Sequence, residues 1–151
     1  MPQDEPDLYY GEHMKAKHRN GGKWTEARYR SFVMSALRKA QWGVKYSAIR
    51  LAYDSVGINP ATKRKRKLYR CASCNNNFPQ DKVVADHISP VVPVTGFDSW
   101  DNVIERMFCE AGGFQVLCKE CHHEKSQKEN KERAINRKKR KEAINGIIEF
   151  L

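Results

Sequence analysis

Apolar residues first follow a helical pattern along the chain. From Trp24 onward they recur at helical spacing, at Tyr29, Phe32, Val33, Ala36, Leu37 and Ala40. This spacing predicts an amphipathic helix, and Thr25 stands where a residue that caps the N-terminus is expected. A second helix is predicted over residues 47–56, ending at Gly57. The pair is expected to pack as a helical buttress on the rest of the protein.

The middle of the chain changes to short segments of strand composition. Residues 68–70 predict a short strand, residues 82–87 a second and residues 114–117 a returning strand. Between the last two lies an excursion, residues 91–113. Its apolar spacing predicts a short helix over 98–108 with Asp98 or Ser99 as its cap.

A small α+β fold follows from this order of elements. From Lys125 onward the residues predict a charged helix that continues towards the C-terminus. We expect four segments: a flexible N-terminal arm (1–22), a helical segment with a basic linker (23–67), a central domain (68–130) and a basic helical tail (131–151).

Four of the five cysteines form two Cys-x-x-Cys pairs, Cys71 with Cys74 and Cys118 with Cys121. Four thiolates at this spacing match the ligand set of a tetrahedral structural zinc. Such a zinc would close the loop between the pairs and stabilise a modest hydrophobic core. The remaining cysteine, Cys109, is expected to be a partly buried apolar residue.

The charge of the chain points to a polyanionic partner. Lys and Arg number 28 against 18 Asp and Glu, which gives a net charge of +10. Charge alone does not separate DNA from RNA or from an anionic membrane. Because the N-terminus lacks the features of a signal peptide and no apolar run approaches about 18 residues, we expect a cytoplasmic protein without a membrane partner.

A second cluster of chemistry-bearing residues lies between and beside the cysteine pairs, at Asp86, His87, His122 and His123. Carboxylate and imidazole groups suit a divalent cation such as Mg, Mn, Ni or Zn, and a neutral imidazole suits a general base at neutral pH. Adjacent strand residues point to opposite faces. Asp86 and His87 can therefore serve one site only if the strand end twists or bulges.

The motifs in order are Cys-x2-Cys, Asp-His-Ile-x-Pro and Leu-Cys-x2-Cys-His-x2-Lys-Ser, over residues 71–126. This region resembles the HNH endonuclease family in its zinc-stapled form, and the wider layout resembles small bacteriophage HNH proteins. The resemblance implies a ββα-metal fold that hydrolyses DNA phosphodiester bonds to 5′-phosphate and 3′-hydroxyl ends. It implies His87 as general base and Asp86 with His122 as ligands of one catalytic metal, for which availability favours Mg.

The sequence departs from the family where the middle Asn is expected, because that position is Gly113. In the family this Asn orients the general base. Three alternatives follow: Gln115 or Asn102 takes its place, a backbone carbonyl suffices, or the protein cuts slowly or not at all. Ser126 stands where some relatives carry a further ligand, and His123 is expected to contact phosphate or solvent.

Double-stranded DNA is the expected partner, bound with low sequence specificity by a monomer or weak homodimer. The expected phosphate contacts are Lys63, Arg64, Lys65, Arg66, Lys67, Lys125, Arg137, Lys138, Lys139 and Arg140. The alternative is a catalytically silent, zinc-stapled DNA-binding module, which would keep the thiolates and the basic runs. An RNA-binding zinc ribbon would display exposed aromatic residues on a strand face, and the sequence offers few.

Overall fold

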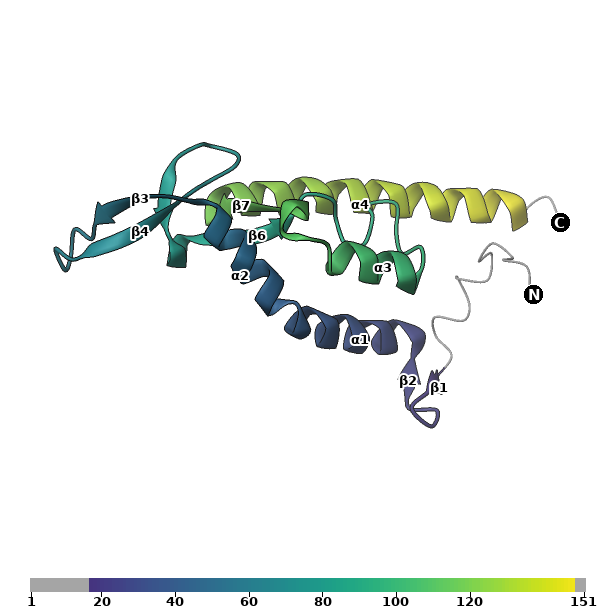
Figure 1. Cartoon of the computed structure of the whole chain (residues 1–151). Helices are drawn as coiled ribbons and strands as arrows, with labels where there is room; N and C mark the ends of the chain where they lie inside the picture. Colours follow the sequence, from purple (N-terminus) through teal and green to yellow (C-terminus); the bar gives the residue numbers. More distant parts are fainter. Residues whose placement is uncertain (1–16, 149–151) are drawn as a thin grey trace. The chain divides into compact units, whose positions relative to one another are not determined.

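The protein has an α+β fold, which the computed structural model describes for residues 17–148, with side chains up to residue 145. The described part contains four α-helices and three small sheets (Figure 1). The chain divides into two compact units with the break between Ala40 and Gln41. No helix of the described part is long and apolar enough to cross a bilayer.

The first unit contains the helix predicted from the apolar spacing. Strand β2 (Trp24–Thr25) leads into α1 (Glu26–Ala40), and the Thr25 hydroxyl accepts a hydrogen bond from the Arg28 amide at 3.3 Å. The predicted helix and its cap are therefore confirmed. The predicted arm, residues 1–22, is corrected at its end, because β1 (Lys17–Arg19) pairs antiparallel with β2, whereas residues 1–16 lie outside the described part.

The second helix differs from its prediction. Helix α2 spans Trp42–Leu51, and the following residues form strand β3 (Tyr53–Ile58) instead of continuing the helix. Apolar residues at positions 53 and 56 fit a helical period, but β3 pairs antiparallel with β4 (Lys65–Arg70) over its length. Cross-strand pairing thus prevailed over a weak local period.

The basic block at residues 63–67 is not the linker that the sequence predicted. Three of its members, Lys65, Arg66 and Lys67, belong to strand β4, which also pairs with β5 (Asn77–Pro79). The expected boundary between residues 67 and 68 lies inside β4. The expected boundary between residues 130 and 131 lies inside helix α4 (Lys119–Ile148), which is continuous.

Strands β6 (Val83–His87) and β7 (Phe114–Cys118) form the antiparallel ribbon that the sequence predicted. Asp86 pairs with Gln115 and His87 with Phe114 in an uninterrupted register. Of the two conditions under which Asp86 and His87 could serve one site, a twist or a bulge of the strand end, the bulge is therefore not present. Because side chains alternate along a strand, Asp86 and His87 leave the ribbon on opposite faces.

Helix α4 (Lys119–Ile148) follows β7 directly, so two antiparallel strands and a helix are consecutive in space, with the excursion inserted between the strands (Figure 1). The ribbon contributes to two buried clusters. Val83 and Val116 pack with Tyr69, while Leu117 packs with Cys71 and Cys118. Both faces of β7 are thus buried, which fixes its register.

The excursion contains α3 (Trp100–Met107), whose N-cap is Ser99, as one of the two predicted alternatives. Side chains attach the preceding loop to the helices: Arg106 donates to the Val91 carbonyl at 2.8 Å, Arg133 to Val92 at 3.3 Å and Asn136 to Val94 at 3.1 Å. These bonds anchor the loop along α4 by its backbone.

Candidate metal centre and adjoining site

The first cysteine pair sits in a tight turn after β4. Asn75 adopts a left-handed conformation with φ of 60°, and its amide donates to the Cys71 carbonyl at 3.0 Å. The Cys71 amide in turn donates to the Asn76 carbonyl at 2.9 Å. Asparagine tolerates this backbone conformation better than most residues, so the local sequence supports the turn that presents Cys71 and Cys74.

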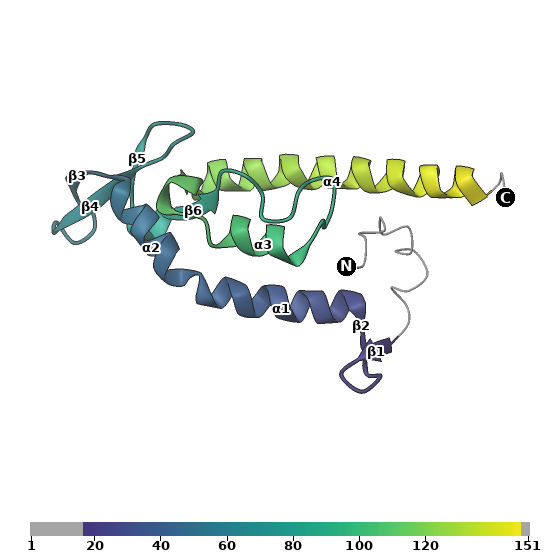
Figure 2. The same ribbon diagram turned by 45° about the vertical axis from the view of Figure 1, so that its right-hand side comes forward.

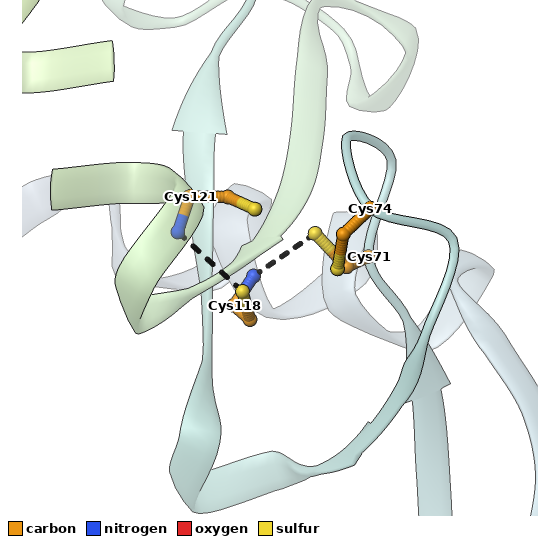
Figure 3. A group of neighbouring side chains, drawn as sticks. All are labelled: Cys71, Cys74, Cys118 and Cys121. Atoms are coloured by element: carbon orange, nitrogen blue, oxygen red, sulfur yellow. Dashed lines mark hydrogen bonds between the residues drawn. The ribbon is translucent and has the colours of Figure 1, made fainter. Parts of the chain in front are cut away.

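The second pair spans the junction of β7 and α4. Cys118 ends the strand and Cys121 lies in the first helical turn, so both face the turn that carries Cys71 and Cys74 (Figure 3). The Cys118 amide donates to the Cys71 sulfur at 3.3 Å, and the Cys121 amide to the Cys118 sulfur at 3.5 Å. Backbone donors of this kind stabilise thiolates.

These four cysteines can hold a metal ion. Their sulfur atoms all lie within 4.8 Å of one another, and thiolates around a tetrahedral zinc with bonds of about 2.3 Å are about 3.8 Å apart. All five cysteines of the chain lie in the described part and none forms a disulfide. The predicted four-cysteine group is therefore present, and its donor chemistry fits zinc.

The pKa values of the Cys71 and Cys118 thiols are shifted in opposite directions. Burial alone would raise the pKa of Cys71, but backbone amides of Cys118, Cys74 and Ser73 outweigh burial and lower it to about 6. Burial, together with neighbouring thiols, raises the pKa of Cys118 to about 12. A divalent cation would remove this conflict, because it stabilises all four groups as thiolates.

A carboxylate and an imidazole meet beside this cluster. The Asp86 Oδ1 atom, at the end of β6, lies 3.9 Å from Nε2 of His122 in the first turns of α4. Two ligands that share one cation at bonds of about 2.1 Å are at most about 4.2 Å apart. The two residues named as metal ligands by the resemblance are thus close enough to bind one ion.

The other oxygen of Asp86 already has a cationic partner. Lys125 donates to Asp86 Oδ2 at 2.7 Å and to the His87 carbonyl at 3.0 Å, and pairs with Glu129 at 2.7 Å. Burial would lower the pKa of Lys125, but its bonds to Asp86 and Glu129 outweigh burial and raise it. Lys125, expected to contact DNA, is thus engaged within the protein.

His87 lies on the opposite face of the ribbon and is 8% exposed. Its Nε2 atom is 2.7 Å from the Gln41 amide nitrogen and 3.2 Å from the Met107 carbonyl oxygen. Gln41 is 1% exposed and also donates to Met107. Burial lowers the pKa of His87 and outweighs the opposite effect of the Met107 carbonyl, so the ring is neutral at neutral pH.

Two hydrogen-bonding schemes satisfy these three groups. An amide nitrogen only donates, so when Gln41 donates to the His87 ring the ring proton resides on Nδ1. When Gln41 donates to Met107 alone, Nε2 of His87 donates to the same carbonyl, which has two lone pairs. Only the second scheme leaves Nδ1 of His87 as a free base.

The residues expected to replace the middle Asn do not contact His87. Gln115 leaves the ribbon on the Asp86 face, and the Asn102 side chain donates to Asp98 at 3.2 Å. Position 113 itself has no room for Asn, because a Cβ atom there would lie 2.5 Å from the Cys109 sulfur. Of the three alternatives, the ring contact is made by a backbone carbonyl, that of Met107.

The remaining predicted site residues lie on α4. His123 is exposed, and its Nε2 atom lies 2.8 Å from the Gln127 amide nitrogen, while Ser126 is half-buried. Arg140 packs its guanidinium against the backbone at Gly96, where a Cβ atom would be 2.5 Å from that group. Arg137, Lys138 and Lys139 are exposed.

Comparison of the chain with models of known protein families, with curated proteins and with solved structures finds no match in any of the three.

Two features of the site were missed by the sequence analysis. The first is Gln41, which is remote in sequence from His87. In this part of the chain the sequence analysis considered only the spacing of the apolar residues. The second is the ion pair of Lys125 with Asp86. The spacing of Lys125 and Glu129, four residues apart in a helix, signalled a local pair but not the contact with a strand.

Proposed function

We propose that the protein is a metal-dependent DNA endonuclease of the HNH type. The observation that carries the proposal is the 3.9 Å approach of Asp86 to His122, two residues from distant parts of the chain, where His122 directly follows Cys121 of the four-cysteine group. His87 follows Asp86 immediately in the sequence. The motif resemblance assigns the same three residues to catalysis.

In this proposal each residue has one role. Asp86 and His122 hold a divalent cation, which when bound would neutralise charge on the phosphate and assist the leaving oxygen. His87 takes a proton from the attacking water through Nδ1 while its Nε2 proton is held by the Met107 carbonyl. The lowered pKa of His87 suits this role, since the base must be neutral before it accepts the proton.

The side-chain alternation along β6 sets a condition on this role. Asp86 and His87 start from opposite faces of the ribbon, so they can serve one phosphate only beyond the strand end, where the backbone ladder stops. His87 is the last residue of β6 but is still paired with Phe114, and the Ile88 amide donates to the Gly113 carbonyl, so the proposal requires the strand end to twist when substrate binds.

A second candidate is a DNA-binding module without catalysis. Three observations favour it: Lys125 neutralises Asp86, Gln41 can occupy the basic nitrogen of His87, and Gly113 replaces the family Asn. The two candidates share the four-cysteine group and the basic surface. They differ only in whether Asp86, His87 and His122 turn over substrate.

Incubation of supercoiled plasmid with the zinc-loaded protein and each of Mg, Mn, Ni and Zn separates them. The endonuclease proposal expects nicked or linear product with at least one of these ions, and none with the His87→Ala variant. His123→Ala is the matched control, because this exposed histidine is the next residue after His122. Equal cleavage by His87→Ala and the parent would remove the base assignment, and no cleavage with any ion would favour the silent module.

A further inference from the structure

The hairpin formed by β3 and β4 has one face that is exposed among the described residues of its unit. Cross-strand pairing of Val56 with Lys67 and of Ile58 with Lys65 puts these four side chains on the same face. Val56 is 54% exposed and Ile58 is 56% exposed, and both lysines are exposed. Among the described residues neither lysine has an ion-pair partner.

The charge around this face is mostly positive, although β3 also contains Asp54, which accepts a hydrogen bond from Asn77. Between Ser55 and Gln80 the chain contains no Asp or Glu, and its six cationic residues are Lys63, Arg64, Lys65, Arg66, Lys67 and Arg70. The first half of helix α4 differs, because Lys125 and Arg133 pair with Glu129, whereas among the described residues its basic run at residues 137–141 has only the pair of Lys138 with Glu142. The hairpin therefore carries positive charge that no described ion pair compensates at Lys65 and Lys67.

The hairpin is also ordered at its tip. The Asn59 side chain accepts hydrogen bonds from the amides of Ala61 at 2.9 Å and Thr62 at 3.4 Å, and the Asn59 amide donates to the Arg64 carbonyl at 2.9 Å. Lys63 completes the turn with φ of 57°. A preordered loop of this kind loses little conformational entropy when it binds a partner.

The shape of the hairpin matches one kind of partner. Each strand has six residues, which corresponds to about 20 Å at about 3.4 Å per residue. Two antiparallel strands form a ribbon that fits the major groove of B-form DNA, which is about 12 Å wide. In Figures 1 and 2 the hairpin and α4 extend in opposite directions from the β6–β7 ribbon, so the hairpin projects clear of that helix.

We propose that the β3–β4 hairpin enters the major groove of duplex DNA with its Val56, Ile58, Lys65 and Lys67 face. The lysines contact phosphates at the groove edges, and the aliphatic side chains contact base edges, including thymine methyl groups. This inference rests on the proposed DNA substrate and adds the groove and the element that reads it. Most of the affinity then comes from phosphate contacts, and the aliphatic side chains add a weak preference for thymine-containing sites.

The combination of side chains favours DNA over the two other occupants of such a face. Binding to an anionic membrane requires a larger apolar face than the two aliphatic residues of this hairpin provide. A second copy of this hairpin would bring like charges of Lys65 and Lys67 together, which is unfavourable. Competition with vesicles and the oligomeric state of the protein distinguish these occupants from DNA.

Binding of the full-length, zinc-loaded His87→Ala protein to a 20-base-pair duplex tests the proposal by fluorescence anisotropy over a salt series. The variant Lys65→Ala/Lys67→Ala is expected to bind at least about 10-fold more weakly, with a salt slope lower by about 0.9 for each phosphate that is no longer neutralised. The matched control, Lys82→Ala/Lys119→Ala, removes two exposed lysines outside the hairpin and is expected to bind within about 3-fold of the parent. Circular dichroism and zinc content establish that all variants are folded.

Two modifications of the DNA test whether the hairpin binds in the major groove. Methylation of guanine N7, which projects into the major groove, is expected to interfere with binding. Replacing thymine by uracil is expected to weaken binding about 2- to 5-fold in the His87→Ala protein but to leave the additional variant Val56→Ser/Ile58→Ser unaffected, because that variant no longer has the aliphatic groups that touch the methyl.

Several outcomes would overturn the inference. Equal binding by the two double-lysine variants would exclude the hairpin as the interface, and insensitivity to N7 methylation would exclude the major groove. Equal competition by anionic phospholipid vesicles would point to a membrane surface instead, and a concentration-dependent dimer that disappears on Ile58→Ser would point to a second copy. Plasmid cleavage is measured separately, with protein that has an intact His87. If DNA binds as expected but is not cleaved, the nuclease proposal is wrong and the hairpin proposal stands.

Discussion

The cysteine group and the Asp86–His122 site lie beside each other but are built on different principles. In the cysteine group four ligands of one chemical type converge within 4.8 Å, two of them in a backbone turn and two at a strand–helix junction. At the second site one carboxylate and one imidazole lie 3.9 Å apart, and a lysine already neutralises the carboxylate. The first ligand set is complete and the second is not.

In the proposed function this difference corresponds to two uses of a metal ion. A complete thiolate set closes the coordination sphere, so an ion there contributes to folding. An incomplete set leaves positions for water and substrate, so an ion there is exchangeable and its affinity depends on what else is bound. The comparison predicts that chemical perturbation of the two sites should have separable consequences, one on the fold and one on turnover.

The largest effect is expected at the cysteine group. Cys118→Ser should unfold the second unit, because a structural zinc contributes about 10 to 16 kcal/mol that the small core does not replace. Circular dichroism and zinc content by mass spectrometry measure this. Cys109→Ser is the control, since Cys109 lies outside the group, and it should keep both signals. A folded, active Cys118→Ser protein would contradict a structural role for the metal.

Turnover should be lost next, without loss of fold. His87→Ala is expected to lower the cleavage rate by at least about 1000-fold, because the general base is removed, while DNA affinity changes by less than about 2-fold. Thermal unfolding should show that the protein remains folded. Retained cleavage in this variant would break the proposed distinction between the two sites.

Gly113→Asn introduces the side chain that the family carries at this position. Its Cβ atom would meet the Cys109 sulfur at 2.5 Å, so we expect destabilisation by about 1 to 3 kcal/mol in urea unfolding. The double variant Gly113→Asn/Cys109→Ala removes that sulfur but keeps the Cβ of residue 109 at 2.9 Å, so it should recover only part of the loss. If the single variant is as stable as the parent, the steric explanation for glycine is wrong.

Gln41→Leu tests the positioning of the general base. The leucine fills a similar volume but donates no hydrogen bond to His87 or Met107, so the ring is less fixed. We expect the cleavage rate to fall about 10-fold with DNA affinity unchanged. A rate above that of the parent would instead show that Gln41 restrains the ring in its inactive tautomer.

The smallest effect is expected from Lys125→Met, which removes the competing cation from Asp86. The affinity for Mn²⁺ should rise several-fold, a change of about 1 kcal/mol. Lys128→Met, a substitution of the same kind on the same helix, provides the control and should leave the affinity unchanged. Unaltered Mn²⁺ binding in Lys125→Met would mean that the lysine does not compete with the ion.

The elements with strong local signals were predicted correctly from the sequence. Thr25 and Ser99 cap their helices as expected, β6 and β7 return at the predicted residues, and the two cysteine pairs meet. Each of these signals depends on residue type at fixed short spacing, which sequence displays directly.

The remaining features depend on contacts between distant segments. Residues 53–58 carry a pattern compatible with helix or strand, and only pairing with β4 decides between them. Gln41 was not recognised because its importance comes from a contact with His87. A contact between residues so far apart in the sequence produces no periodic pattern. The exclusion of Asn at position 113 likewise required the position of the Cys109 side chain.

Titration of Mn²⁺ into the zinc-loaded His87→Ala protein with duplex DNA, followed by electron paramagnetic resonance, most directly tests the division into a folding metal and a catalytic metal. The account predicts one bound Mn²⁺ per chain, lost in the additional variants Asp86→Ala and His122→Ala, with one zinc per chain throughout. Mn²⁺ binding that persists in both variants, or zinc loss that accompanies either substitution, would contradict it.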